Sequence, residues 1–244
     1  MSLEYYDDID QIISDNKEAG IDKIIISGCE EKEIISSIDY INKYEDVYAT
    51  IGYHPSEASK VDFSNIKELE KRIKNNKKII GIGEIGLDYH YGKEDIELQK
   101  KLFEYQLQLA EKLDLPVVIH SRDAVNDTIE ILKKHSVKGI IHCFSGSIET
   151  AKIYISMGFK LGIGGVLTFK NSKLYQVIDN ISMSDIVLET DSPYLTPEPF
   201  RGKKNSSKYI PLIAEKIAQI KNISIEEVSK YTLENTYNLF DLNK

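Results

Sequence analysis

Short apolar runs alternate along this chain with longer stretches in which apolar residues return every three or four positions. The short runs are rich in β-branched residues, as strands buried on both faces are, and the longer stretches have the period of amphipathic helices. Strands are therefore predicted to begin near residues 24, 47, 79, 117, 139, 160 and 186. Helices are predicted over residues 3–19, 30–44, 64–75, 95–113, 124–135, 148–157, 171–178 and 209–219, with a last one from the capping box that starts at Ser224.

The alternation continues along the whole chain, with no linker, repeat or low-complexity segment. We therefore expect residues 1–244 to form a single domain of the α/β class. Regular strand–helix alternation over about 250 residues is typical of a TIM (β/α)8-type barrel. The pattern supplies seven strands and begins with a helix, so we expect the first strand of the barrel to be absent from this chain. Such a barrel would keep an unpaired edge between its first and last strands.

Four of the predicted strands are followed by a side chain that can bind a metal ion: Glu84, His120, His142 and Asp191. Because the carboxyl ends of parallel strands meet at one rim, these side chains are expected to lie together. Carboxylates and imidazoles are common ligands of zinc, manganese and mixed divalent sites. Taken singly, a buried histidine is more often a hydrogen-bonded core residue, and Glu84 could be a helix cap. Four such residues at four strand ends favour a metal site.

Charge is unevenly distributed along the chain. The net charge of −8 by itself argues against a nucleic-acid-binding protein. The acidic excess lies in residues 1–46, which hold thirteen acidic and four basic residues, and the rest of the chain is nearly neutral. Residues 200–208 contain four basic residues and no acidic one. A sequence-specific duplex binder would be basic overall, whereas an enzyme that holds a short strand or an end needs only a local positive rim.

Four further residues are candidates for contacting phosphate. Arg122 follows a predicted strand, and its guanidinium would bind phosphate through two hydrogen bonds, or else form an ion pair with a neighbour such as Asp123. His54 ends another strand and would contact phosphate or the leaving group. Arg201 and Lys203 follow the last strand, where barrels commonly bind phosphate, although a solvated loop explains them equally well.

The sequence also indicates where the protein resides. No apolar run approaches the roughly 18 residues of a membrane-spanning helix, and no secretory leader is present. Cys29 and Cys143 are far apart and form no Cys-x-x-Cys motif, so free thiols in a reducing compartment are expected. We therefore expect a cytoplasmic protein with no membrane association.

The segments around the candidate residues resemble those of one enzyme family. In the order found in the TatD-type metal-dependent deoxyribonucleases, which belong to the amidohydrolase-like TIM barrels, the chain contains GEIGLDYH, PVVIHSRDA, HCFSGS, LETDSPYL and PFRGKKNSS. The resemblance covers nearly the whole chain. It implies that Glu84 bridges two metal ions and that His120 and His142 hold the second ion. It also implies that Asp191 binds the first ion and acts as general base on water.

The chain departs from the family pattern at its start. In the family the first strand ends in a His-x-His pair that binds the first metal ion, but no histidine precedes His54 here. Either the natural protein has lost this strand or the sequence is a truncated product. The resemblance then leaves the first ion only Glu84 and Asp191, while the second keeps Glu84, His120 and His142. We expect up to two ions, of magnesium, manganese or zinc, with the second site better occupied.

The resemblance implies a metal-dependent phosphodiesterase that hydrolyses DNA, acting as a 3′-exonuclease on single strands or ends. Two alternatives stay open. One is an amidohydrolase-like enzyme acting on a small ester or amide, since barrels of this shape host many reactions. The other is a metal-depleted remnant that binds nucleic acid or a partner without turnover. The sequence does not determine the oligomeric state, and a monomer is the working expectation.

Overall fold

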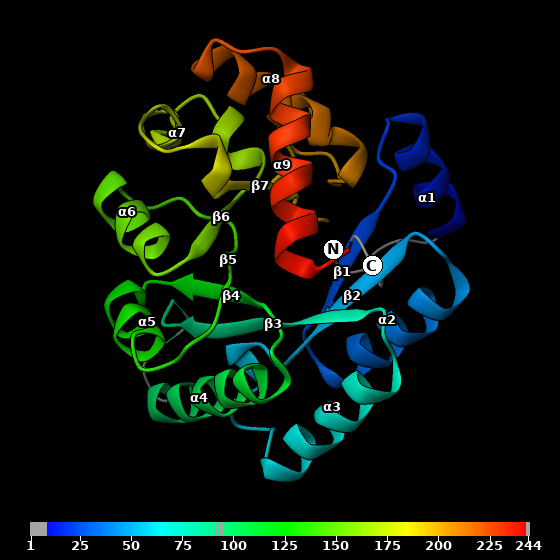
Figure 1. The fold of residues 1–244 in the computed structure, drawn as a ribbon, viewed down its shortest axis with the longest axis vertical. Coiled ribbons are helices and arrows are strands. Elements are labelled where there is room, and N and C mark those ends of the chain that lie inside the picture. The colour runs from blue at the N-terminus through cyan, green and yellow to red at the C-terminus, as the bar shows by residue number, and fades with distance from the viewer. Residues whose placement is uncertain (1–8, 91, 93–94, 243–244) are drawn as a thin grey trace. The chain divides into compact units, whose positions relative to one another are not determined.

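The computed structural model describes residues 9–90, 92 and 95–242, and Figure 1 shows their arrangement. The strands found there are β1 (Ile24–Gly28), β2 (Val47–Ile51), β3 (Ile79–Asp88), β4 (Val117–Arg122), β5 (Gly139–Ile141), β6 (Phe159–Ile163) and β7 (Ile186–Leu188). The helices are α1 (Ile9–Glu18), α2 (Glu31–Lys43), α3 (Phe63–Asn75), α4 (Ile96–Leu113), α5 (Val125–Leu132), α6 (Ile148–Ser156), α7 (Leu174–Asn180), α8 (Ile210–Lys221) and α9 (Ile225–Phe240).

Strand order in the sheet follows chain order from β1 to β7. The pairs β2–β3, β3–β4 and β6–β7 are parallel, and parallel neighbours need the crossover connections that the intervening helices supply. The predicted α/β class with seven strands is therefore confirmed for the described residues. The prediction of a missing first strand concerns the start of the chain, where residues 1–8 lie outside the described residues.

The chain divides into two compact units, each described here by itself. Unit 1 comprises Met1–Ile24 and Ile140–Lys244, and unit 2 comprises Ile25–Gly139. That both belong to one domain stays a prediction.

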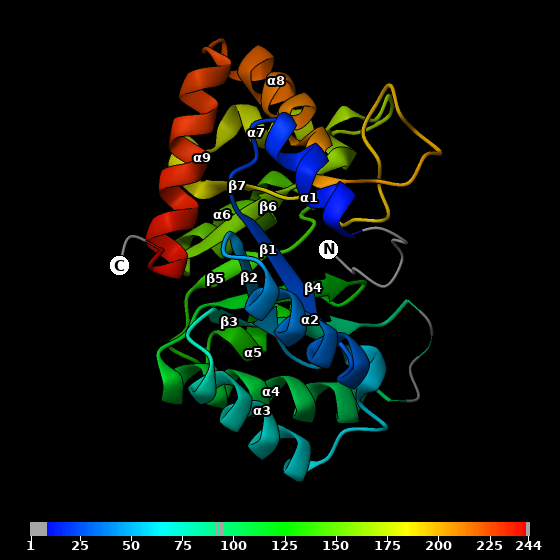
Figure 2. The same ribbon diagram turned by 90° about the vertical axis from the view of Figure 1, so that its right-hand side faces the viewer.

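Unit 2 is built on strands β2, β3 and β4, with α4 packed against β3 and α2 against β2. Figure 2 shows α3 and α4 side by side on this unit. Ile82 of β3, Leu107 of α4 and Ile119 of β4 are fully buried. Burying an aliphatic side chain of this size contributes about 1.5–3 kcal/mol, so this apolar layer accounts for much of the unit's stability.

Strands β3 and β4 are longer than their apolar runs predicted. The runs ended at Gly83 and Ile119, whereas the strands continue to Asp88 and Arg122. The reason lies partly at Gly86, which has a φ of +145° and pairs with His120; an added Cβ there would lie 2.0 Å from the His120 carbonyl oxygen. The close backbone approach continues the ladder past the first polar residues, so these lie within strands and not after them.

Unit 1 packs α8 and α9 against each other and against β7, as Figure 1 shows. The capping box predicted at Ser224 is present, because its side chain accepts the Glu227 N–H while Glu227 accepts the Ser224 N–H. Asn235 of α9 donates to the carbonyl oxygens of Met183 and Ile186 at 2.8 and 2.7 Å. This side chain ties α9 to the start of β7.

Several helix ends differ from the prediction. The helix predicted over residues 124–135 ends at Leu132, because the N–H groups of Lys134 and His135 bond to carbonyl oxygens three residues back, as in a turn. The helix predicted over residues 171–178 starts at Leu174, whose N–H is accepted by the Ser172 hydroxyl. Of the helix predicted over residues 3–19, the structure shows Ile9–Glu18, and residues 1–8 lie outside the described residues.

Candidate functional site

In unit 2, His120 lies between two carboxylates. Its Nδ1 is 2.7 Å from Glu84 Oε1, and its Nε2 is 3.1 Å from Asp88 Oδ2. The strand register explains this position, since His120 pairs with Gly86 and the two carboxylates stand two residues to either side of Gly86 on β3. A neutral imidazole has one N–H and donates to only one of the two carboxylates, so the other contact requires a second proton or a cation between the two atoms.

His54 lies against the same histidine. The two rings meet edge-on with centroids 4.5 Å apart. His54 precedes the short helix η2 (Pro55–Glu57), and its Nδ1 accepts the Ser56 N–H at 3.2 Å. One ligand atom each from His54, Glu84 and His120 lie within 4.8 Å of one another, a spacing that a divalent metal ion could join with small side-chain shifts.

Two buried glutamines of α4 hold the backbone at this cluster. Gln106 accepts the Tyr53 N–H at 2.7 Å and donates to the Tyr53 carbonyl oxygen at 3.0 Å, directly before His54. Gln99 makes the same pair of bonds with the backbone of Asp88, both at 2.9 Å. Each side-chain amide therefore bonds to the backbone as a neighbouring strand would. In this way α4 holds the backbone at the ends of β2 and β3.

The local electrostatics favour a charged Asp88. Burial opposes its ionisation, but bonds from His120 and from the His90 N–H, with the positive charge of Arg122, outweigh burial and lower its pKa. Nearby, burial raises the pKa of the Cys29 thiol, and the carboxylates of Glu84 and Glu33 raise it further. Cys29 is therefore a protonated thiol at neutral pH and a poor nucleophile.

In unit 1, His142 also lies between two carboxylates. Its Nδ1 is 2.5 Å from Glu189 Oε2, and its Nε2 is 3.4 Å from Asp191 Oδ1. The Cys143 N–H donates to the other Glu189 oxygen. Gly162 on β6 makes room for this carboxylate, since an added Cβ would lie 2.8 Å from its carboxyl carbon.

Each of the two clusters contains two kinds of carboxylate. Asp88 and Glu189 each have one oxygen at a histidine nitrogen and the other accepting a backbone N–H, from His90 and Cys143 respectively. Both oxygens are thus engaged by the protein. Such carboxylates orient an imidazole that uses its other nitrogen elsewhere. Ligand atoms of His142, Cys143 and Glu189 also lie within 4.8 Å of one another, but the engaged oxygens of Glu189 suit an orienting role better.

The structure brings the predicted metal ligands together in pairs. Glu84 lies with His120 in unit 2, and His142 lies with Asp191 in unit 1. The alternative that Glu84 is a cap is wrong, because Glu84 lies inside β3. That all four residues converge on one centre stays a prediction.

Sequence reasoning missed Asp88 and Glu189. For Asp88 the signal was present, since residues an even number apart on a strand share a face. Asp88 is four residues after Glu84 on β3, and Glu189 is two residues before Asp191. Asp88 was passed over because its strand was taken to end at the first polar residue, and Glu189 was passed over in favour of Asp191 in the same motif.

Three of the four predicted phosphate-binding residues occupy exposed positions, and His54 is partly buried. Arg122 ends β4, and the neighbouring Asp123 accepts a contact from His90 Nδ1 at 3.1 Å. Arg201 lies on the loop after β7, with its guanidinium 3.8 Å from the centroid of the Phe169 ring. Lys203 lies on the same loop, 5.2 Å from the centroid of Phe200. That these cations bind phosphate stays a prediction.

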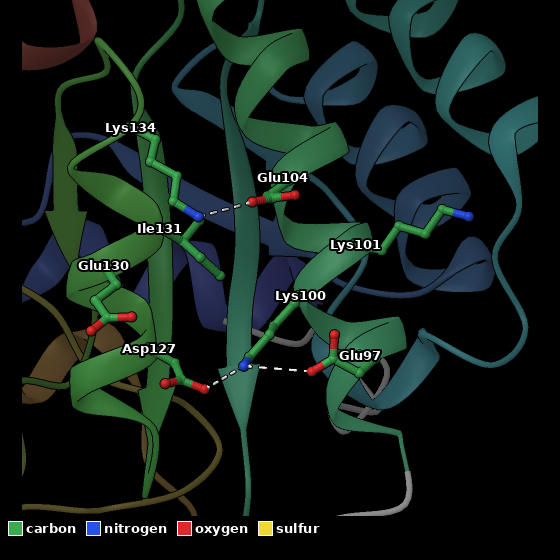
Figure 3. A pocket seen from close by; sticks show the side chains of 8 residues that line it. All are labelled: Glu97, Lys100, Lys101, Glu104, Asp127, Glu130, Ile131 and Lys134. Carbon is green, nitrogen blue, oxygen red and sulfur yellow. Dashed lines mark ion pairs between the residues drawn. The ribbon is translucent and has the colours of Figure 1, made fainter.

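A groove between α4 and α5 is lined by charged side chains and Ile131, and Figure 3 shows that ion pairs join several of these charges. Lys100 contacts Asp127 at 2.8 Å and Glu97 at 3.6 Å, and Lys134 contacts Glu104 at 3.7 Å. Exposed pairs like these contribute at most about 1 kcal/mol each. We interpret the groove as a solvated junction between two helices and not as a catalytic site.

Within the described part of the chain, no helix is long and apolar enough to cross a membrane.

Comparison with known proteins places the chain in a family. The sequence model described as TatD related DNase matches residues 1–241. The metal-dependent hydrolase YabD of Bacillus subtilis is 39% identical over 251 aligned positions, spanning 100% of this chain and 97% of YabD. Among solved structures, the TatD homologue YjjV of Escherichia coli superposes with a TM-score of 0.89 at 29% identity, over 95% of this chain and 91% of YjjV.

A second solved structure supports the same assignment. The TatD family hydrolase of Entamoeba histolytica has a TM-score of 0.84 at 26% identity, over 96% of this chain and 89% of the other. Together with the observed strand order, these likenesses confirm the predicted TIM-barrel class of α/β fold, with seven strands in the described residues. The chain therefore belongs to the TatD-related DNase family of metal-dependent hydrolases, as its motifs indicated.

Proposed function

We propose that this protein is a divalent-metal-dependent phosphodiesterase that hydrolyses DNA, removing nucleotides from the 3′ end of single strands. The proposal rests on His120 and His142. Each has one ring nitrogen at an orienting carboxylate and the other ring nitrogen at the carboxylate of a candidate metal ligand. Membership of the DNase family supports the choice of a phosphodiester substrate.

The residues present fit a divalent cation. His120 Nδ1 and Glu84 Oε1 already lie 2.7 Å apart, with His54 in the same group. His142 Nε2 faces Asp191 in unit 1 in the same way. Imidazole nitrogen with carboxylate oxygen is a donor set that zinc and manganese accept readily. We propose Glu84, His120, His142 and Asp191 as metal ligands, with Asp88 and Glu189 orienting the histidines.

A bound divalent cation would polarise the phosphoryl group and offset the charge that develops on it. The remaining tasks fall to the chain's own side chains. Asp191, which is partly exposed beside His142, would take the proton from the attacking water. Arg122, Arg201 and Lys203 would bind backbone phosphates, and His54 would contact the phosphate or the leaving group.

The test uses single-stranded oligonucleotides labelled at the 5′ end, with metal-free protein and added manganese, magnesium or zinc. We expect a ladder of products shortened one nucleotide at a time, and we expect a phosphorothioate at the last 3′ linkage to block it. Duplex DNA of the same sequence should be cut more slowly. Glu84→Gln should abolish cleavage, because it removes a charged ligand with little change in shape.

Two outcomes would overturn the proposal. Hydrolysis of a lactone, dihydroorotate or a phosphotriester without cleavage of any oligonucleotide would favour an amidohydrolase-like activity. Oligonucleotide binding with no turnover under any metal would indicate a non-catalytic binding protein.

A further inference from the structure

Tyr194 exposes a large aromatic ring three residues after Asp191. Its side chain is 56% exposed, the highest fraction among the large hydrophobic residues in the described part of the chain. The other strongly exposed ones lie on helices: Ile35, Leu98, Ile153, Tyr175, Tyr231 and Leu233. Tyr194 instead lies on the loop that joins β7 to the short helix η5 (Ser207–Tyr209), next to a candidate catalytic residue.

The backbone that carries this ring is held in place. The Tyr194 N–H donates to the Asp191 carbonyl oxygen at 2.8 Å. Asn205, almost fully buried, donates to the carbonyl oxygens of Tyr194 and Thr190, both at 2.6 Å. The Asn205 N–H donates to the Pro193 carbonyl oxygen at 3.0 Å. One buried amide therefore fixes the chain on both sides of Asp191, and the backbone that carries Tyr194 is positioned three residues from that carboxylate.

The same loop presents exposed cations. The Thr196 hydroxyl donates to the Lys203 carbonyl oxygen at 2.5 Å, and Arg201 Nη1 donates to the Thr196 carbonyl oxygen at 3.4 Å. These bonds join the two arms of the loop, so both cations lie on the arm paired with the one that carries Tyr194. Arg201 and Lys203 are exposed, and residues 200–208 include no acidic side chain.

We propose that Tyr194 stacks on the face of an unpaired nucleobase next to the scissile linkage, while Arg201 and Lys203 contact phosphates of the same strand. An exposed aromatic ring beside exposed cations is the pattern by which proteins bind single-stranded nucleic acid. A base inside a duplex has both faces covered by its neighbours, so this contact selects single strands and frayed ends. The inference rests on the proposed nuclease function and adds the residue that contacts the unpaired base.

The experiment measures affinity for a fluorescent single-stranded oligonucleotide by anisotropy in the presence of a chelator, where no cleavage occurs. Tyr194→Leu should weaken binding about 5- to 100-fold, the loss typical of one stacked base, whereas Tyr194→Phe should bind nearly as the wild type. Tyr231→Leu, which removes a similarly exposed tyrosine from α9, is the matched control and should bind normally. Thermal unfolding of all four proteins checks that each is folded.

An abasic series identifies the contact. Strands lacking one base at successive positions from the 3′ end should bind the wild type more weakly at one position, and Tyr194→Leu should be insensitive at that position. Two results would overturn the inference: Tyr194→Leu binds the intact strand as tightly as the wild type, or the wild type loses the same affinity for every abasic strand. If the wild type cleaves single strands and Tyr194→Leu binds unchanged, only the stacking contact is wrong. If the wild type neither binds nor cleaves any oligonucleotide, the proposed function fails and this inference fails with it.

Discussion

His120 and His142 use opposite ring nitrogens toward their orienting carboxylates. Asp88 holds Nε2 of His120, whereas Glu189 holds Nδ1 of His142. The nitrogen left to face the candidate ligand is therefore Nδ1 in one cluster and Nε2 in the other. An orienting carboxylate fixes the tautomer and raises the basicity of the imidazole, so it contributes to metal affinity without touching the metal.

Glu189→Gln tests this role. The amide keeps the shape of the side chain but removes the charge that holds His142, so we expect metal affinity to fall about 10- to 100-fold. Calorimetric titration of metal-free protein with zinc or manganese measures it. Glu111→Gln is the control, because Glu111 holds His135, which belongs to neither cluster, at 3.0 Å in a comparable pair. Equal metal affinity in wild type and Glu189→Gln would contradict the orienting role.

At the scale of elements, α4 is both a core helix and a support for the site. Gln99 and Gln106 are seven residues apart, about two helical turns, so they share a face of α4. That face meets the backbone at Tyr53 and at Asp88. The two buried amides of α4 thus bond to backbone at the end of β3 and just after β2.

Gln106→Leu should be costly for stability. It leaves the N–H and carbonyl oxygen of Tyr53 buried without their partners, and each such group costs about 1–3 kcal/mol. We expect a loss of about 2–4 kcal/mol in the free energy of unfolding, measured by urea denaturation. Gln108→Leu changes an exposed glutamine on the same helix and should alter stability by less than about 0.5 kcal/mol. Similar losses in both variants would show that the Tyr53 bonds matter little.

The stability that the contact between α2 and α3 contributes should depend on pH. Hydrogen bonding from Arg72 outweighs burial and, with a bond from Tyr53, lowers the pKa of Glu31. A carboxyl with a lowered folded-state pKa contributes stability above its unfolded pKa of about 4.3, and this is lost as the pH falls through the folded value. The free energy of unfolding of the wild type should exceed that of Glu31→Gln by up to about 1 kcal/mol at pH 7. The difference is small because the Glu31–Arg72 pair is partly exposed.

Urea denaturation from about pH 7 to about pH 3 measures this difference. The gap between wild type and Glu31→Gln should close toward the acidic end. A gap that stays constant over this range would show that the charge of Glu31 contributes nothing. Glu68→Gln, whose contact with the same Arg72 is longer at 3.4 Å, should show a smaller gap.

For the molecule as a whole, divalent ions should stabilise the folded state. An ion that binds only the folded protein, present at about 100 times its dissociation constant, adds about 2.7 kcal/mol to stability. We expect chelation to lower the melting temperature and manganese or zinc to restore it, as measured by calorimetry. Glu84→Gln should respond less, because it loses a charged donor from the group with His54 and His120. A wild-type melting temperature indifferent to every divalent ion would contradict the proposed ligands.

The order and class of the elements, and the chemistry at the strand ends, could be predicted from local sequence patterns. Apolar periodicity is a local property, so strand starts and most helices followed from it, and Glu84, His120, His142 and Asp191 stood out as polar residues that interrupt apolar runs. The family motifs are likewise contiguous segments, and so they were readable without a fold.

Which polar side chains meet could not be predicted from local patterns and became known from the folded structure. Glu189 reaches His142 across 47 positions, and Gln106 reaches Tyr53 across 53. Such partners depend on strand register and on the rotation of α4 about its axis, which are set by packing between elements distant in sequence. Burial is encoded locally by side-chain hydrophobicity, but the partner of a buried polar group is chosen by geometry that exists only once the sheet and its helices have assembled.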